Sequence, residues 1–224
     1  MVTRRTYGDR CGVAHALDML GERWALLVVR DLLLGPKRFR DLQAGLPGCG
    51  PNVLTTRLNE LQDAGVVRKR TLPPPAGSRV YELTEWGAEL EPIVVALGVW
   101  GARAPVLRPR GELRADSLML SVREALDPAA LGPEGRVVEV HLGEDTFTVD
   151  ARDSVRVSRG QTTRHPDAVV QVDAQSLGAL MAGEDDVDAA VAADRVQLQV
   201  DVSAGLDFLR AIHATDLSRA ASAG

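Results

Sequence analysis

The sequence predicts an α+β protein of two domains, in which a mainly helical half precedes an antiparallel sheet covered by helices. Apolar residues recur at helical spacing up to about residue 102, whereas short segments beyond residue 114 alternate apolar and polar residues. Between the two patterns, residues 105–114 hold two prolines, a glycine and three arginines, which is typical of a linker. We therefore expect domains at residues 1–104 and 115–224.

The first three helices are expected at residues 12–20, 24–34 and 39–46. Gly21 ends the first helix, and the second is apolar nearly all round, so it belongs in the middle of a core. In the turn between the second and third helices, Arg38 and Arg40 stand on either side of Phe39. These two arginines are candidates for contacts with phosphate.

The helix expected at residues 50–64 has two faces with different chemistry. Leu54, Leu58 and Leu61 form an apolar stripe that must be buried. The other side carries short amides, hydroxyls and a guanidinium, which can hydrogen-bond base edges and phosphates: Asn52, Thr55, Thr56, Arg57 and Asn59. An ordinary surface helix shows the same pattern, so this helix alone does not decide the function.

A basic hairpin follows that helix. Residues 66–72 and 79–84 read as two strands around a proline-rich tip. The strands carry four cations with no acid before Glu82, namely Arg68, Lys69, Arg70 and Arg79. A helix with a groove-compatible face followed by a basic hairpin is the layout of a winged helix-turn-helix domain that binds double-stranded DNA.

A last helix of the first domain is expected from Thr84, its cap, to about residue 102. It carries more large apolar residues than a small closed domain can bury, namely Trp86, Leu90, Val94, Leu97 and Trp100. We therefore expect a homodimer interface, shared with the first helix. Coverage of this face by the second domain is the alternative.

Four motifs of the first hundred residues occur in the order and spacing of a known family. CGVAHALDMLGERW at 11–24, LLLGPKRF at 32–39, LTTRLNEL at 54–61 and YELTEWG at 81–87 resemble the HxlR-type winged-helix transcriptional regulators. The resemblance implies a DNA-binding regulator that dimerises through its first and last helices, and we expect a repressor. One departure is Gly50-Pro51-Asn52, where a hydroxyl residue often opens the recognition helix.

The two cysteines are candidates for a redox role. Cys11 precedes the first helix, where the helix N-terminus and nearby Arg10 would lower a thiol pKa. The family resemblance implies that a cysteine at this place can sense electrophiles, and Cys49, beside the expected recognition helix, is the candidate resolving partner. The alternative is that each is a small hydrophobic residue, which is a common role for free Cys.

The second domain shows the alternation of a sheet with one buried face. Strands are expected at residues 137–142, 146–151, 155–158, 169–172 and 196–200, and helices at 117–126, 175–181, 187–193 and 204–213. This series resembles the sterol-carrier-protein-2-like domains, which enclose an apolar cavity. The residues that would line it are also ordinary core residues: Met119, Val122, Phe147, Leu180, Met181, Phe208 and Ile212.

Charge separates the two halves. Residues 1–110 hold 16 Lys and Arg against 11 Asp and Glu, whereas residues 111–224 hold 10 against 20. Phosphate neutralisation supplies most non-specific DNA affinity, so the first half is the candidate DNA-binding half. The acidic second half disfavours phosphorylated ligands, and we expect it to bind a neutral or cationic, apolar effector.

No pattern of a catalytic, nucleotide, cofactor or metal site occurs, so we expect no enzyme, no cofactor and no metal. The four histidines have no metal-ligand spacing, and the acids at 184–188 lack that of a calcium loop. No membrane span or signal peptide is recognisable, so we expect a cytoplasmic protein. The alternative function is a carrier of lipids or other hydrophobic ligands, or a scaffold, that uses its winged helix for protein contacts.

Overall fold

The computed structural model describes residues 6–73, 77–104 and 113–213, and the chain divides into two compact units, Met1–Val95 and Ala96–Gly224. Residues 74–76 of the expected hairpin tip and 105–112 of the expected linker lie outside the described residues. The boundary between the units falls inside a helix of the first half. The domain limits expected from the sequence stay a prediction.

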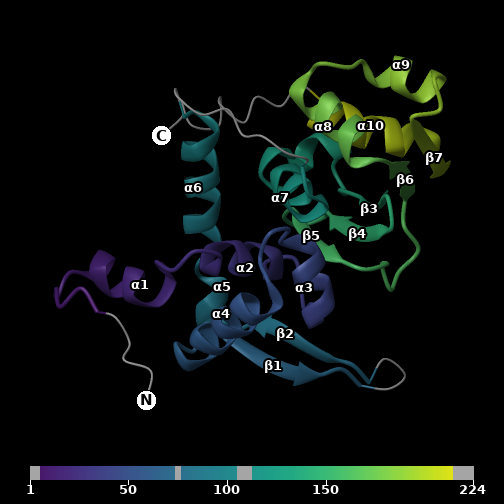
Figure 1. The fold of residues 1–224 in the computed structure, drawn as a ribbon. Helices are drawn as coiled ribbons and strands as arrows, with labels where there is room; N and C mark the ends of the chain where they lie inside the picture. Colours follow the sequence, from purple (N-terminus) through teal and green to yellow (C-terminus); the bar gives the residue numbers. More distant parts are fainter. Residues whose placement is uncertain (1–5, 74–76, 105–112, 214–224) are drawn as a thin grey trace. The chain divides into compact units, whose positions relative to one another are not determined.

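The first four helices pack around one core in the N-terminal unit, as the apolar periodicity predicts (Figure 1). They are α1 (Gly12–Leu20), α2 (Ala25–Leu32), α3 (Phe39–Gly45) and α4 (Pro51–Asp63). The apolar stripe of α4 is fully buried and belongs to the same core as Val28 and Val29 of α2. Pro51 stands in the first turn of α4, and Gly65 just beyond its end has a φ of +76°, a conformation that favours glycine.

The wing follows α4 as an antiparallel hairpin of β1 (Val67–Thr71) and β2 (Arg79–Leu83). It is tied to the turn before α3 by two backbone hydrogen bonds. Lys37 N donates to Tyr81 O at 2.9 Å, and Tyr81 N donates to Lys37 O at 2.8 Å. Thr84 ends the hairpin, and its hydroxyl accepts from the backbone N–H of Gly87, so it caps the next helix as expected.

The single helix expected from Glu85 to residue 102 is wrong in one respect. The structure has a short α5 (Glu85–Ala88) and a separate α6 (Glu91–Ala102). Pro92 explains the break, because a proline has no N–H to donate and its ring would clash with the carbonyl of Ala88 in a continuous helix. In the first turn of a new helix the same residue is well tolerated.

The C-terminal unit contains a five-stranded sheet in the order β5-β4-β3-β6-β7. The strands are β3 (Val137–Leu142), β4 (Asp145–Asp150), β5 (Arg156–Arg159), β6 (Ala168–Val172) and β7 (Val196–Val200). The expected antiparallel sheet is wrong for one pair, because β6 returns beside β3 and runs parallel to it. Alternation reports which face is buried but not the direction of a strand, so the sequence pattern could not show this.

Helices contact this sheet in the places that the sequence predicts. They are α7 (Ala115–Ala125), α8 (Ala174–Ala182), α9 (Val187–Ala192) and α10 (Val202–Ile212), with a short 3-10 helix, η1 (Pro128–Leu131). Figure 1 shows α7, α8 and α10 gathered beside the sheet. The likeness to sterol-carrier-protein-2-like domains stays a prediction. None of the described helices is both long and apolar enough to cross a membrane.

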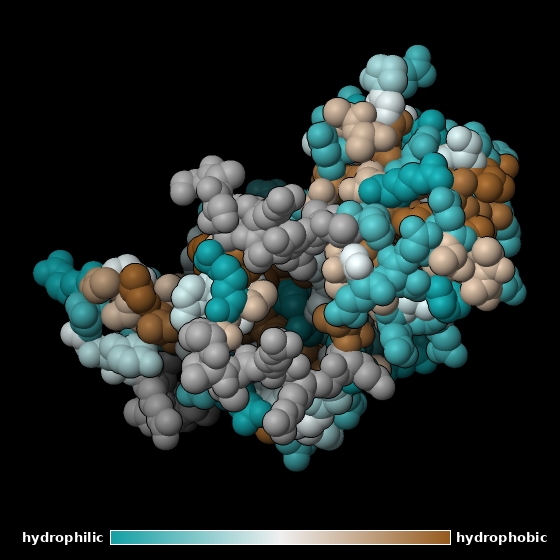
Figure 2. Space-filling model, turned by 90° about the horizontal axis from the view of Figure 1, so that it is seen from above, coloured by the Kyte–Doolittle hydropathy of each residue, from teal (hydrophilic) through white to brown (hydrophobic). Residues whose placement is uncertain are grey.

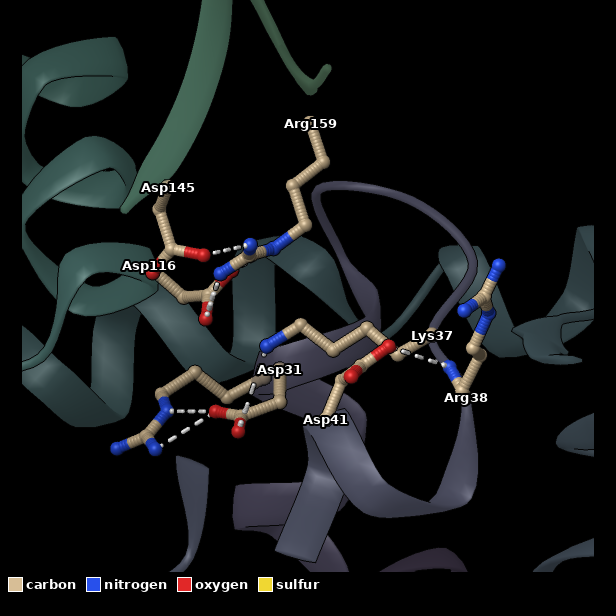
Figure 3. Close-up of polar contacts among 8 residues, drawn as sticks. Asp31, Lys37, Arg38, Asp41, Asp116, Asp145 and Arg159 are labelled. Atoms are coloured by element: carbon tan, nitrogen blue, oxygen red, sulfur yellow. Dashed lines mark hydrogen bonds and ion pairs between the residues drawn. The ribbon is translucent and has the colours of Figure 1, made fainter. Parts of the chain in front are cut away.

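An ion cluster around the buried Asp116 fixes α7 to the sheet. Arg159 of β5 donates to Asp116 in the first turn of α7 at 2.8 and 3.0 Å, and to Asp145 of β4 at 2.5 Å (Figure 3). Its guanidinium also lies 4.8 Å from the centre of the Phe147 ring. Asp116 is only 4% exposed, so its charge requires these partners.

Candidate nucleic-acid interface

Helix α4 exposes the face that the sequence predicts for base recognition. Asn52, Thr55, Thr56 and Asn59 are exposed, while the leucine stripe on the opposite side holds the helix on the core. Val53, which the sequence reading left out, is also exposed, at 44%. It stands off the leucine stripe, and this was the available signal that it would face outward.

The two threonines present oxygen acceptors at this surface. Thr55 Oγ1 donates to Pro51 O at 2.8 Å, and Thr56 Oγ1 donates to Asn52 O at 3.0 Å. Each hydroxyl proton is therefore used inside the helix, while the lone pairs and the methyl group remain at the surface. In this rotamer the threonines suit base amino groups, which donate, and thymine methyl groups.

Arg57 is held by protein carboxylates. Its side chain is 14% exposed, and its Nη1 forms a close ion pair with Glu60 and lies 3.8 Å from Glu22. A phosphate would have to displace these acids to reach the guanidinium. The expected DNA contact of Arg57 stays a prediction, and the geometry assigns it a role in holding α4.

The wing contains an acid that the sequence reading did not connect with its cations. Arg68 Nε and Arg70 Nε each donate to a different oxygen of Glu82, both at 2.8 Å. Burial raises the pKa of Glu82, but the hydrogen bonds from the two arginines more than offset this, so its pKa is lowered and it stays ionised. The hairpin register places Arg68 opposite Glu82, so counting back from the tip would have found the pair.

The other two wing cations are placed differently. Lys69 Nζ lies 5.3 Å from the centre of the Tyr81 ring, which orients the ammonium without neutralising it. Arg79 is exposed and has no ion pair among the residues that the structure describes. These two side chains therefore carry the uncompensated positive charge of the wing.

The basic residues in the turn before α3 differ in how far they are exposed to solvent. Arg40 is 74% exposed and lies 3.4 Å from Asp41, a weak surface pair that a phosphate can replace. Arg38 is half-buried, and its backbone N–H donates to Asp41 (Figure 3). Lys37 is 3% exposed and belongs to the protein interior.

The cysteines lie in opposite environments. Cys11 is exposed at the start of α1, and hydrogen bonds from the backbone N–H groups of Ala14 and Val13 lower the pKa of its thiol. Cys49 is buried in the core beside α4, and burial raises its pKa. The thiolate is the reactive form, so the structure favours Cys11 over Cys49 as a nucleophile. The redox role of either stays a prediction.

Comparison with known proteins agrees with this geometry. The HxlR-like helix-turn-helix model matches residues 19–106. The HTH-type transcriptional regulator sll1512 of Synechocystis is 34% identical over 95 residues, which cover 42% of this chain and 70% of that protein. The HTH-type transcriptional regulator YvaP of Bacillus subtilis is 39% identical over 85 residues, or 38% of this chain and 79% of that protein. The chain belongs to the HxlR-like helix-turn-helix family.

Among solved structures, the reduced form of the transcriptional regulator YodB from Bacillus subtilis is 29% identical, covering 44% of this chain and 97% of that one, with a TM-score of 0.39. The family expected from the motifs is confirmed for the N-terminal half. This HxlR-like chain is thus a helix-turn-helix transcriptional regulator. Residues 107–224 lie outside the family match.

In the second unit, the apolar residues predicted as ligand contacts are all buried, at 5% exposure or less. They are Met119, Val122, Phe147, Leu180, Met181, Phe208 and Ile212, and they form the core between the sheet and its helices. An apolar ligand would have to separate these elements to reach them. Among the described residues, no group of three or more His, Cys, Asp or Glu is placed to hold a metal ion.

Proposed function

We propose that this HxlR-like chain is a homodimeric repressor that binds specific sites in double-stranded DNA, with its C-terminal unit as the effector-binding part. The observation that carries the proposal is the exposed face of α4. It presents amides, hydroxyls and an apolar group on a helix whose other side is fully buried. Such a helix fits the major groove, where each base pair shows a distinct pattern of donors, acceptors and methyl groups.

The wing supports this assignment through its charge. Arg79 and Lys69 are left uncompensated, whereas Arg68 and Arg70 share Glu82. A protein-contact module needs no such row of cations, while a phosphate backbone attracts it. We propose repression as the direction of regulation, because a dimer on two half-sites about 34 Å apart occupies DNA that RNA polymerase would otherwise bind. A reporter gene with the chain's site at its promoter should fall in expression when the chain is produced.

The test separates phosphate contacts from base contacts. Arg79→Ala should weaken binding to every duplex and reduce the slope of log K against log salt by about 0.9, because one phosphate contact is lost. Asn52→Ala should leave the slope unchanged and cost about 1–3 kcal/mol at one base position only. Electrophoretic mobility shift or fluorescence anisotropy at several salt concentrations measures both.

Arg164→Ala, which removes an exposed cation of the second unit, is the matched control and should bind as the parent does. The proposal is wrong if the parent protein shows no preference for any duplex at low salt. Equal losses for Arg79→Ala and Arg164→Ala would instead show that binding follows net charge and does not pass through the wing.

Val53 gives a sharper prediction on the same helix. It is a branched apolar residue exposed in the first turn of α4, next to Asn52, and the thymine C5-methyl is the apolar group of the major groove. Replacing one thymine of the site by deoxyuridine removes that methyl and should cost the parent protein about 0.8 kcal/mol, or about fourfold in affinity.

Val53→Ala should bind the thymine and deoxyuridine duplexes equally at that position. The other thymines of the site serve as internal controls, since their replacement should affect parent and variant alike. If the parent tolerates deoxyuridine at every position, Val53 contacts no thymine methyl.

The effector assignment rests on the C-terminal unit being a separate folded body. The apolar effector expected from the sequence requires the closed core to open, so its binding should be slow and should compete with folding. A neutral apolar fluorescent probe such as N-phenyl-1-naphthylamine measures this directly, because the acidic unit does not repel it. Failure of the probe to gain fluorescence with the full-length chain would exclude this class of effector.

A further inference from the structure

The sheet of the C-terminal unit has a second face, and polar side chains line up on it. His141 of β3 pairs with Gln171 of β6, and Gln171 pairs with Gln197 of β7. Residues paired across strands point to the same face, with neighbouring strands about 4.8 Å apart. The three side chains therefore form a row across three strands. This row lies on the face opposite the apolar core.

The row opens into a hollow of about 440 Å³. Gly143 and Asp173, which follow β3 and β6, contribute to its wall, together with Asp194 and Arg195 of the turn before β7. The hollow is thus at the carboxyl ends of the two parallel strands, where sheets of parallel strands commonly bind ligands. Its volume falls within the range of small-molecule sites.

The imidazole of this row is held by a buried acid. His141 Nε2 lies 2.6 Å from Glu139 Oε1, and the other oxygen of Glu139 accepts from Thr162 N at 3.2 Å. Glu139 is 8% exposed, although it stands on the polar face of the sheet. A carboxylate that binds one ring nitrogen fixes the orientation of the ring and leaves the other, Nδ1, for a ligand.

The side-chain amides of Gln171 and Gln197 can hydrogen-bond a ligand. Within residues 6–73, 77–104 and 113–213, neither Gln171 nor Gln197 has a side-chain hydrogen bond. Each amide presents two donors and an acceptor in one plane. Two such planes beside an imidazole match a ligand that has its own planar donors and acceptors.

The charged residues around the hollow determine which net charge its ligand can carry. Arg195 contributes a positive charge to the wall of the hollow, but it is paired with Asp185 at 2.7 Å. Asp173 accepts from Ser176 N and from Ser176 Oγ, both at 2.8 Å, so it stays ionised, and Asp194 is exposed. The hollow therefore has a negative balance, which repels carboxylates and phosphates and attracts or tolerates cations and neutral molecules.

We propose that this hollow binds a neutral or cationic small molecule with a planar amide or amidine group, held by Gln171, Gln197 and His141. The site belongs to the C-terminal unit, whereas the proposed DNA-binding face belongs to the N-terminal unit, and it lies on the sheet face opposite the apolar core. It gives the acidic unit a polar ligand where the sequence reading expected an apolar one.

Three isosteric probes test the proposal on the full-length chain without DNA: benzamidine, benzamide and benzoate. The first is a cation, the second is neutral and the third is an anion, while all share one ring. Titrations followed by the side-chain amide NMR signals of glutamine should give millimolar dissociation constants for benzamidine and benzamide, and binding at least about tenfold weaker for benzoate.

Gln171→Ala and Gln197→Ala should each weaken benzamide binding by about tenfold, the effect of one well-placed hydrogen-bonding group. The matched control is Gln199→Ala, on the same face of β7 but outside the hollow, which should bind as the parent does. The backbone NMR spectrum shows whether each variant keeps its fold.

The proposal is overturned by equal or tighter binding of benzoate, by binding unchanged in both glutamine variants, or by no binding of any probe in the millimolar range. Because the measurement uses no DNA, its outcome is independent of the DNA-binding proposal. Loss of binding in Gln199→Ala alone would place the probes elsewhere on the sheet and would also contradict it.

Discussion

Asp31→Ala is expected to cost the N-terminal unit about 3–5 kcal/mol of unfolding free energy, because it removes a buried carboxylate that pairs with both Lys37 and Arg30. Asp31 and Lys37 are 1% and 3% exposed, and Lys37 Nζ lies 3.7 Å from Asp31 Oδ2 (Figure 3). Arg30 donates to the other oxygen at 2.7 and 2.9 Å. The total unfolding free energy of a small domain is only about 5–15 kcal/mol, so the variant should be partly unfolded at physiological temperature.

Lys37 makes this pair a link to the wing. Its backbone exchanges two hydrogen bonds with Tyr81, so loss of the side-chain anchor should loosen β2 as well as α2. Gly45 leaves the space for the acid, since a Cβ there would lie 2.5 Å from Asp31 Oδ2. DNA binding should therefore fall together with stability, although neither residue is at the proposed interface.

Urea unfolding followed by tryptophan fluorescence measures the effect. Trp24 and Trp86 lie in the N-terminal unit, and Trp100 lies in α6, so none of the three tryptophans is in the sheet of the second unit. Asp63→Ala, at an exposed position, is the control and should change stability by less than about 0.5 kcal/mol. The double variant Asp31→Leu, Lys37→Met should regain most of the loss, since no buried charge remains. A loss below about 1 kcal/mol for Asp31→Ala would mean that water reaches the pair.

The predictions from sequence are confirmed where the spacing of apolar residues within one segment determines the element. The leucine stripe of α4 requires one buried face, and the helix is found where that pattern predicts it. The strand β3 is also found where its alternation predicts it, but Val137 and Glu139 on its second face are buried too, so the expected exposed face is wrong for this strand. The family motifs added the order of the N-terminal elements. The exposed polar face of α4 followed directly, because a helix with one buried side must expose the other.

Several features of the structure could not be predicted, because the residue that determines them is distant in sequence. Lys37 is buried by an acid and by the wing, and a lysine carries no local sign of burial. Glu82 is an intermediate case, because it lies 14 residues from Arg68, yet pairing the two strands outward from the hairpin tip would have placed the two residues opposite each other. The parallel placement of β6 depends on the path of the chain after β5. The row of His141, Gln171 and Gln197 exists only because of that placement.

The surface of α6 leads to the prediction with the largest functional effect. Ile93, Leu97 and Trp100 are 56%, 46% and 69% exposed and stand at i, i+4 and i+7, so they form one apolar stripe. On α1, Val13 and Leu17 are 68% and 43% exposed at i and i+4. Figure 2 shows hydrophobic residues gathered on α1, at its left edge. A soluble monomer rarely exposes such stripes, and a homodimer would bury them.

Leu97→Glu should dissociate that dimer, because each interface would bury two unpaired carboxylates. Glutamate is a good helix former, and Leu97 is exposed within the chain, so the fold of α6 should persist. Without the dimer, the second half-site is no longer bound by a tethered partner, and affinity for a two-half-site duplex should fall by about 10²–10⁴ fold. Affinity for a single half-site should not change.

Ala102→Glu is the matched control, since this exposed residue lies on the opposite side of α6 from the stripe. It should keep both the dimer and the affinity. Sedimentation gives the oligomeric state, and mobility shift with one-site and two-site duplexes gives the affinities. A dimer that survives Leu97→Glu would move the interface away from α6. A monomer that still binds the two-site duplex with parental affinity would show that each chain reads its half-site independently, and that dimerisation adds nothing to recognition.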